Sequence, residues 1–150
     1  MKGSKIYNVG IYIRLSREDE DKKKMESESI SNQRNIILDY INKQDENFKI
    51  YDEYVDDGVS GTTFDRPEFK RLKNDIEKGK VGVVIVKDLS RLGRDHIMTG
   101  YYLEHFFPEY KVRFIAINDD VDSEKGINDF TPFKNIMNEL LYIYSTGNKL

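Results

Sequence analysis

Serine and arginine side chains gather at the ends of two apolar segments of this chain. Arg14 and Ser16 end one segment, and Arg91 and Arg94 follow another. Arginine carries a permanent charge and a planar fork of donors that fits phosphate oxygens. A serine hydroxyl becomes a good nucleophile once its proton is removed and the attacked phosphate is neutralised. We therefore interpret these residues as a site for phosphoryl transfer.

Both segments have the pattern of buried strands. Residues 81–86, Val-Gly-Val-Val-Ile-Val, are apolar on both alternating faces, which predicts a parallel strand that is covered on both sides. Residues 9–16 place Arg14 and Ser16 on the same face as Tyr12, with isoleucines on the other face. Open α/β sheets bind ligands at the carboxyl ends of their strands. We therefore expect the serine and the arginines to converge on one open pocket at that edge.

The rest of the chain alternates strand and helix patterns, which favours an α/β fold with a mainly parallel central sheet flanked by helices. Strands are expected near residues 6–14, 48–54 and 112–117, helices over 31–44, 67–78 and 95–108, and loops over 17–28, 56–65 and 119–124. A last, amphipathic helix opens at Thr131 and Pro132 and carries a broad apolar face.

Composition narrows the class of protein. At 150 residues the chain is long enough for one domain with its own core. It has no cysteine, which excludes disulfides and thiolate metal sites, and His96 and His105 form no recognisable ligand cluster. We expect neither a metal nor a cofactor. No stretch reaches membrane-spanning length and no signal peptide precedes the first strand, so a cytoplasmic protein without a membrane partner is expected.

Charge argues against a DNA-binding domain that acts alone. The chain has 24 basic and 27 acidic residues, for a net charge of −3. Affinity for DNA comes largely from basic side chains that neutralise phosphates. A basic surface must therefore be local, or a DNA-binding portion lies outside these residues.

Four motifs follow one another along the chain. They are Tyr12-Ile-Arg14-Leu-Ser16, then Gln33, then Asp57-Gly-Val-Ser60-Gly61 leading to Arg66-Pro67, and finally Ser90-Arg91-Leu92-Gly93-Arg94. In order and spacing they resemble the catalytic domain of the serine recombinases, the resolvase/invertase family, and most of all its large, transposon-type branch. The resemblance covers roughly residues 6 to 140.

The resemblance implies a site-specific DNA recombinase with a resolvase-like catalytic fold. Ser16 would attack a DNA phosphodiester, become joined to the 5′ phosphate and release a 3′ hydroxyl, with no need for ATP or a metal. The arginines that would bind the phosphate and stabilise its transition state are Arg14, Arg66, Arg91 and Arg94. Gln33 would hydrogen-bond near the scissile phosphate. The implied substrate is double-stranded DNA at recombination sites, and no small-molecule substrate is expected.

The resemblance also implies an assembly. In this family the last helix is long and forms the subunit interface, so a homodimer that assembles to a tetramer is expected. Separate DNA-binding domains normally follow the catalytic domain, and none is present in residues 1–150. The chain is therefore interpreted as an N-terminal catalytic domain.

Two departures from the family leave a second interpretation open. Ser90 stands where many members have an aspartate, so a proton-transfer role for that aspartate does not carry over. The end of the chain, residues 140–150, lacks the arginine- and acid-bearing stretch usual in the long helix. The altered C-terminus and the acidic net charge favour the alternative, a non-catalytic, truncated recombinase-like dimerisation module, while the retained serine and arginines count against it. A phosphate-binding enzyme of flavodoxin-like fold is disfavoured, because no glycine-rich phosphate loop follows the first strand.

Overall fold

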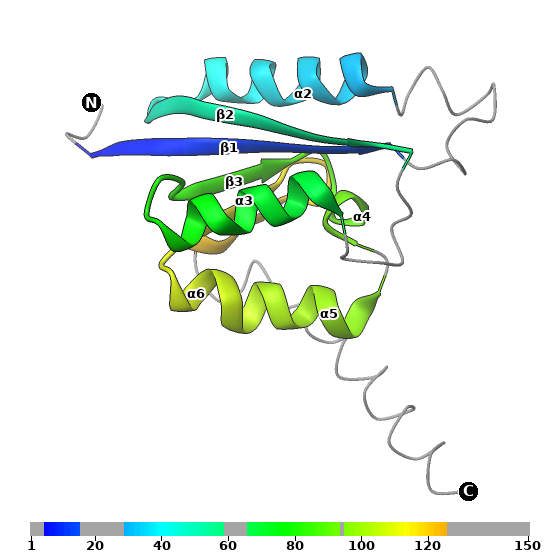
Figure 1. Ribbon diagram of the computed structural model, residues 1–150. Coiled ribbons are helices and arrows are strands. Elements are labelled where there is room, and N and C mark those ends of the chain that lie inside the picture. Colours follow the sequence, from blue (N-terminus) through cyan, green and yellow to red (C-terminus); the bar gives the residue numbers. More distant parts are fainter. Residues whose placement is uncertain (1–4, 16–28, 59–65, 94, 126–150) are drawn as a thin grey trace, which may run out of the picture.

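The structure, a computed structural model, describes residues 5–15, 29–58, 66–93 and 95–125 (Figure 1). Within these ranges one sheet has the strand order β2-β1-β3-β4-β5. Its strands are β1 (Ile6–Leu15), β2 (Asn47–Asp57), β3 (Val83–Val86), β4 (Arg113–Ala116) and β5 (Val121–Asp122). The first four run parallel, and β5 pairs antiparallel with β4. The predicted mainly parallel sheet is confirmed.

Helices cover both faces of the sheet. Helix α2 (Ile30–Lys43) lies on one face, while α3 (Pro67–Glu77) and the helical run that starts with α5 lie on the other (Figure 1). That run consists of α5 (His96–Tyr101), the π-helical turn η2 (Tyr102–Phe106) and α6 (Phe107–Glu109). The single turn α4 (Leu89–Leu92) follows β3, and a 3₁₀ turn, η3 (Ser123–Lys125), follows β5. Within the described ranges, no helix has the length and apolar character needed to cross a membrane.

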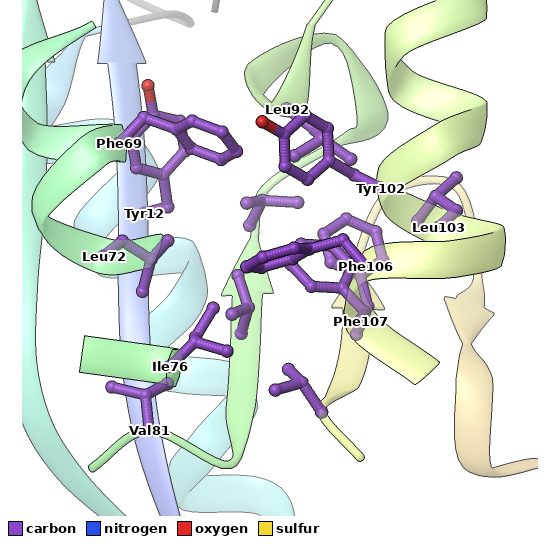
Figure 2. Close-up of a cluster of buried hydrophobic side chains, with 14 of the residues drawn as sticks. Tyr12, Phe69, Leu72, Ile76, Val81, Leu92, Tyr102, Leu103, Phe106 and Phe107 are labelled. Carbon is purple, nitrogen blue, oxygen red and sulfur yellow. The ribbon is translucent and has the colours of Figure 1, made fainter. Parts of the chain in front are cut away.

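Two apolar clusters hold the layers together, one on each face of the sheet. Between the sheet and α2 lie Val9, Ile11, Ile13, Ile37, Val83, Ile85 and Ile115. On the other face an aromatic-rich cluster joins the sheet to α3 and the α5–α6 run, with Tyr12, Phe69, Leu72, Tyr102 and Phe106 among its members (Figure 2). The predicted division of β1 is therefore confirmed, with its isoleucines facing α2 and Tyr12 facing α3.

The bounds of α3 follow from its terminal residues. Pro67 occupies the first turn, where its missing N–H would have no intrahelical partner in any case. Gly79 adopts a φ of 75°, a left-handed conformation that glycine reaches without steric cost, just after the helix ends. Between these points Phe69, Leu72 and Ile76 are buried, as the helical periodicity predicts.

One residue in β2 shifts its register against β1. Val9 pairs with Ile50 but Gly10 pairs with Asp52, so Tyr51 is an extra residue, which makes a β-bulge. Beyond the bulge, the residues of β2 that share a face with Tyr12 are Asp52, Tyr54 and Asp56, because side chains alternate along a strand. Polar contacts of this half of β2 hold α3 in place.

The expected loops differ from the structure at two places. The acidic stretch 119–124 contains β5 and the start of η3. Strand β5 forms because Arg113 donates two hydrogen bonds, of 2.9 and 2.7 Å, to the buried Asp122 carboxylate. An aspartate in a strand is disfavoured unless such a partner is present, and sequence periodicity does not show the pairing. Strand β2 also runs on to Asp57, into the stretch expected as a loop. The expected loop 17–28 and the expected C-terminal helix lie outside the described residues.

Candidate active site

Four of the six residues predicted for the site lie together near the carboxyl ends of β1 and β3. Arg14 comes from the end of β1, Gln33 from the first turns of α2, Arg66 from the residue before α3, and Arg91 from α4. Exposure is 0% for the first three and 2% for Arg91. Ser16 and Arg94 lie outside the described residues, so their place in this site stays a prediction.

Arg14 and Arg91 are joined crosswise through the backbone. Arg91 Nη1 donates to the carbonyl oxygen of Arg14 at 2.7 Å, and Arg14 Nη2 donates to the carbonyl oxygen of Ser90 at 2.8 Å. Gln33 Nε2 also donates to the carbonyl oxygen of Arg14, at 3.1 Å. The end of β1, from which the chain runs directly into Ser16, is thus fixed by side chains of both α2 and α4.

Arg66 connects α3 to the same turn. Its guanidinium donates to the carbonyl oxygen of Arg91 at 3.1 Å and to that of Leu92. The guanidinium carbon lies 5.4 Å from the ring centroid of Tyr12 and 4.8 Å from that of Phe69, within the range of cation–π attraction. Burial lowers the pKa of Arg66 from its ordinary value, against the opposing effects of Tyr12 and Asp56. An arginine nevertheless keeps its charge in a protein.

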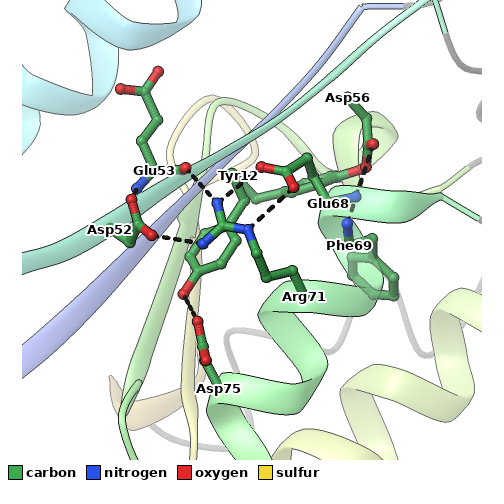
Figure 3. A network of polar contacts seen from close by, with 9 residues as sticks. Tyr12, Asp52, Glu53, Asp56, Glu68, Phe69, Arg71 and Asp75 are labelled. Carbon is green, nitrogen blue, oxygen red and sulfur yellow. Dashed lines mark hydrogen bonds and ion pairs between the residues drawn. The ribbon is translucent and has the colours of Figure 1, made fainter.

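Asp56 fixes the start of α3 and was not among the predicted site residues. This carboxylate accepts hydrogen bonds from Tyr12 Oη at 2.8 Å and from the backbone N–H groups of Glu68 and Phe69, each at 3.0 Å (Figure 3). Burial raises the pKa of Tyr12 well above its ordinary value, so the phenol stays neutral and donates. The only hint in the sequence was that Asp56 is an acidic residue next to the Asp57-Gly58 motif. The partners of Asp56 are 12 to 44 residues away along the chain, so local pattern does not reveal them.

A second polar network clamps α3 against β2. Arg71 donates to Asp52 at 2.6 Å, to Glu68 at 2.8 Å and to the carbonyl oxygen of Glu53 at 3.0 Å (Figure 3). Its guanidinium carbon lies 4.1 Å from the ring centroid of Tyr54. These contacts and the Asp56 contacts hold α3 in one position, and with it Arg66.

The turn α4 is held by carboxylates from two directions. Asp88 caps it by accepting from the backbone N–H of Ser90 at 3.0 Å and from the Ser90 hydroxyl. The same oxygen, Oδ1, lies 3.6 Å from Arg91 Nε. Asp119 accepts from the backbone N–H of Leu89 at 2.6 Å. Residues 89–92 therefore form a capped helical turn that presents Arg91 to the end of β1.

The described part of the site is closed, and the expected open pocket stays a prediction because Ser16 and Arg94 lie outside the described residues. The guanidinium groups of Arg14, Arg66 and Arg91 are buried and donate to backbone carbonyl oxygens of β1 and α4. The expected convergence of Arg14 and Arg91 is present. Three buried cations close together favour an anionic ligand, and arginine suits phosphate in particular.

No group of three or more His, Cys, Asp or Glu side chains within the described ranges could hold a metal ion. The expectation of chemistry without a metal or cofactor stays a prediction.

Known proteins resemble this chain in both sequence and fold. The family model "Resolvase, N terminal domain" matches residues 9–145. A "Putative DNA recombinase" of Bacillus subtilis (strain 168) is 31% identical over 112 residues, which are 75% of this chain and 21% of that protein. The chain thus spans about a fifth of the length of that relative.

Two solved structures resemble the whole chain. The N-terminal catalytic domain of TP901-1 integrase superimposes with a TM-score of 0.75 at 27% identity, covering 93% of this chain and 97% of that one. A resolvase family site-specific recombinase from Streptococcus pneumoniae gives a TM-score of 0.64 at 25% identity, covering 95% of both chains. The family match extends over most of the chain and both solved structures share its fold, so the chain belongs to the resolvase N-terminal domain family, the catalytic domain of the serine recombinases.

Proposed function

We propose that this chain is the catalytic domain of a site-specific recombinase that cuts and rejoins double-stranded DNA through a covalent 5′-phosphoserine at Ser16. The observation that carries the proposal is the gathering of Arg14, Arg66 and Arg91 around the strand end that leads directly into Ser16. The family membership and the DNA recombinases among the relatives support it.

The chemistry assigns separate roles to the serine and the arginines. The Ser16 oxygen forms a bond to phosphorus, the bond from phosphorus to the 3′ oxygen breaks, and the hydroxyl proton of Ser16 is released as the leaving oxygen gains one. Attack by a 3′ hydroxyl on the phosphoserine reverses these steps, so the phosphate-ester energy is conserved and no ATP is used. Arg14, Arg66, Arg91 and Arg94 offset the charge that builds on the phosphoryl oxygens.

The closed state of the site sets a condition for this reaction. The described guanidinium groups donate to backbone carbonyl oxygens, so a DNA phosphate must replace some of these bonds or bring the β1 end and α4 apart. We infer that DNA binding and subunit assembly supply the free energy for this rearrangement. Gln33, which holds the Arg14 carbonyl, would act on the same strand end.

The proposed partners are double-stranded DNA at a recombination site and further copies of the chain, in a homodimer that assembles to a tetramer. With a net charge of −3, residues 1–150 are expected to bind DNA weakly, so site recognition is proposed to need other parts of the protein. The protein would act on DNA in the cytoplasm.

The test is the capture of a covalent intermediate. The protein in its full-length form is incubated with DNA that carries candidate recombination sites, and the adduct is located by mass spectrometry. Ser16→Ala should abolish cleavage and the adduct but leave DNA binding nearly unchanged, since the hydroxyl contributes little charge or contact area. Ser123→Ala, which removes a hydroxyl that accepts from the backbone N–H of Phe114, is the matched control and should cleave normally.

The same experiment separates the enzyme from a non-catalytic dimerisation module. The closed arginine cluster is the observation that favours the module. A chelator should leave cleavage by the wild type unchanged. Cleavage that survives Ser16→Ala, or that stops on adding a chelator, rules out the serine mechanism, and a chain that dimerises without ever cleaving supports the module.

A further inference from the structure

We propose that Asp88 is a positioning residue for Arg91, with its carboxylate charge holding the arginine in the orientation that the site needs. The inference rests on the proposed function for its activity readout. Three groups meet one oxygen of this carboxylate, Oδ1. They are the Ser90 backbone N–H at 3.0 Å, the Ser90 hydroxyl, and Arg91 Nε at 3.6 Å.

The turn that carries Arg91 is too short to position a side chain by itself. Helix α4 has four residues, and one turn of helix is marginal without tertiary contacts. Asp88 is anchored to this turn through its bonds to Ser90, so its carboxylate is fixed relative to the backbone that bears Arg91. It meets the guanidinium at Nε, while Nη1 of the same group donates to the Arg14 carbonyl. Two opposite edges of the guanidinium are thereby held.

Burial makes this contact stronger than a surface ion pair. The exposed fraction of the Arg91 side chain is 3% and that of Asp88 is 20%. A buried cation is costly unless a carboxylate or hydrogen bonds compensate it. Ser90, the residue directly before Arg91, has no carboxylate of its own, and its hydroxyl donates to the Asp88 carboxylate. The carboxylate near Arg91 is thus supplied from residue 88.

The chain offers a substitution that separates charge from structure. Asparagine caps helices about as well as aspartate, so Asp88→Asn keeps an acceptor for Ser90 and removes only the charge. Asp95 is the matched control, because it caps α5 by accepting from Ile97 and Met98. Asp95→Asn makes the same chemical change seven positions further along the chain.

In the full-length protein we expect Asp88→Asn to slow single-turnover cleavage at saturating DNA by about 10-fold, the order expected when a largely buried guanidinium loses its ion-pair partner. DNA affinity should change little. Asp95→Asn should cleave within about twofold of the wild type. Equal slowing by the two variants would show a general effect on the fold and overturn the inference.

A rescue variant tests the carboxylate itself. Because the Ser90 hydroxyl touches the Asp88 carboxylate, Ser90→Asp places a second carboxylate against the first. Like charges repel, so this single variant should cleave more slowly than the wild type. The double variant D88N/S90D has one carboxylate again and should cleave faster than either single variant. General destabilisation cannot produce that pattern, and a double variant no faster than D88N overturns the inference.

One readout does not depend on catalysis. The Nε–H signal of Arg91, assigned by its loss in Arg91→Lys, reports solvent exchange by ¹⁵N NMR. Its exchange should be faster in Asp88→Asn and unchanged in Asp95→Asn. A wild type that never cleaves DNA defeats the proposed function alone. Exchange that Asp88→Asn leaves unaltered defeats the positioning role.

Discussion

Arg91 Nη1 donates to the backbone carbonyl oxygen of Arg14 at 2.7 Å, and Arg14 donates to the carbonyl oxygen of Ser90, the residue before Arg91. Each arginine therefore fixes the stretch of backbone that bears the other. Both side chains are buried at the carboxyl edge of the sheet. Substitution of either residue should consequently alter the geometry of the loop as well as the charge of the site.

Arg91→Ala is expected to slow DNA cleavage by about 10³- to 10⁵-fold, the range seen when an arginine that stabilises a phosphoryl-transfer transition state is lost. Arg91→Lys should recover only part of the rate, because an ammonium group cannot reproduce the planar fork that bridges two acceptors. Single-turnover cleavage rates at saturating DNA measure both effects. Arg34→Lys, at the partly exposed pair with Glu53, is the control and should cleave normally. An Arg91→Lys variant as fast as the wild type would contradict this role.

Asp56→Ala should lower the free energy of unfolding by about 2–4 kcal/mol, because it leaves two buried donors and one partly buried donor without their acceptor. Tyr12→Phe removes only one of these bonds and should cost about 1 kcal/mol. Urea denaturation monitored by circular dichroism measures both values. If Asp56→Ala proved no more costly than Tyr12→Phe, the capping of α3 by Asp56 would contribute nothing to stability.

Gly10→Ala should destabilise the protein by about 1–3 kcal/mol through overpacking. A Cβ atom at this position would lie 3.0 Å from Leu72 Cδ1, 3.1 Å from Val81 Cγ1 and 3.2 Å from Tyr54 Cε2. Gly82→Ala is the matched control, since a Cβ there meets no atom within 4 Å. Thermal melting of the two variants should show a lower midpoint for Gly10→Ala alone.

The free energy of unfolding should fall in acid, because protonation of Asp52 and Glu68 weakens their bonds to Arg71. Its hydrogen bonds hold the pKa of Asp52 below the ordinary 3.8 and that of Glu68 below the ordinary 4.5. A carboxyl whose pKa is lower in the folded state stabilises the fold fully above its unfolded pKa, and that contribution is lost as pH falls through the folded value. The loss should therefore begin below about pH 4.5.

Arg71→Met should make this acid loss smaller, because it removes the guanidinium but keeps a side chain against Tyr54. Both carboxylates are about a third or more exposed, so the difference should be at most about 1 kcal/mol. Urea denaturation at pH 7, 4 and 3 compares the two proteins. The same pH dependence in both would show that Arg71 does not set these pKa values.

The parts of the fold that depend on local pattern were predictable. The run of valines and isoleucine at 83–86 has one apolar face for α2 and another for α3, and the structure buries all four residues. A helix was predicted to begin at Asp95, and the Asp95 carboxylate accepts from the N–H groups of Ile97 and Met98 at the start of α5. In both cases the determining residues are close together in the sequence.

The features that sequence reasoning missed depend on distant partners. Asp122 belongs to a strand because Arg113 binds it, and Asp56 is buried because Tyr12 and the start of α3 supply donors. The hydrogen bonds that bury Arg14, Arg66 and Arg91 were missed for a related reason. The arginines were interpreted by their affinity for phosphate, whereas backbone carbonyl oxygens are acceptors that every loop provides and that no residue type reveals.

The extra residue at Tyr51 switches the faces of the sheet to which the even-numbered residues of β2 point. Before it, Tyr7 pairs with Phe48, and after it, Tyr12 pairs with Tyr54 and Arg14 with Asp56. If Tyr51 paired with Gly10 instead of bulging, the later half would slip by one residue, so that Val55 would stand opposite Arg14 and Asp56 would face α2. The bulge at Tyr51 therefore sets the face on which Asp56 meets the start of α3, and with it the position of Arg66.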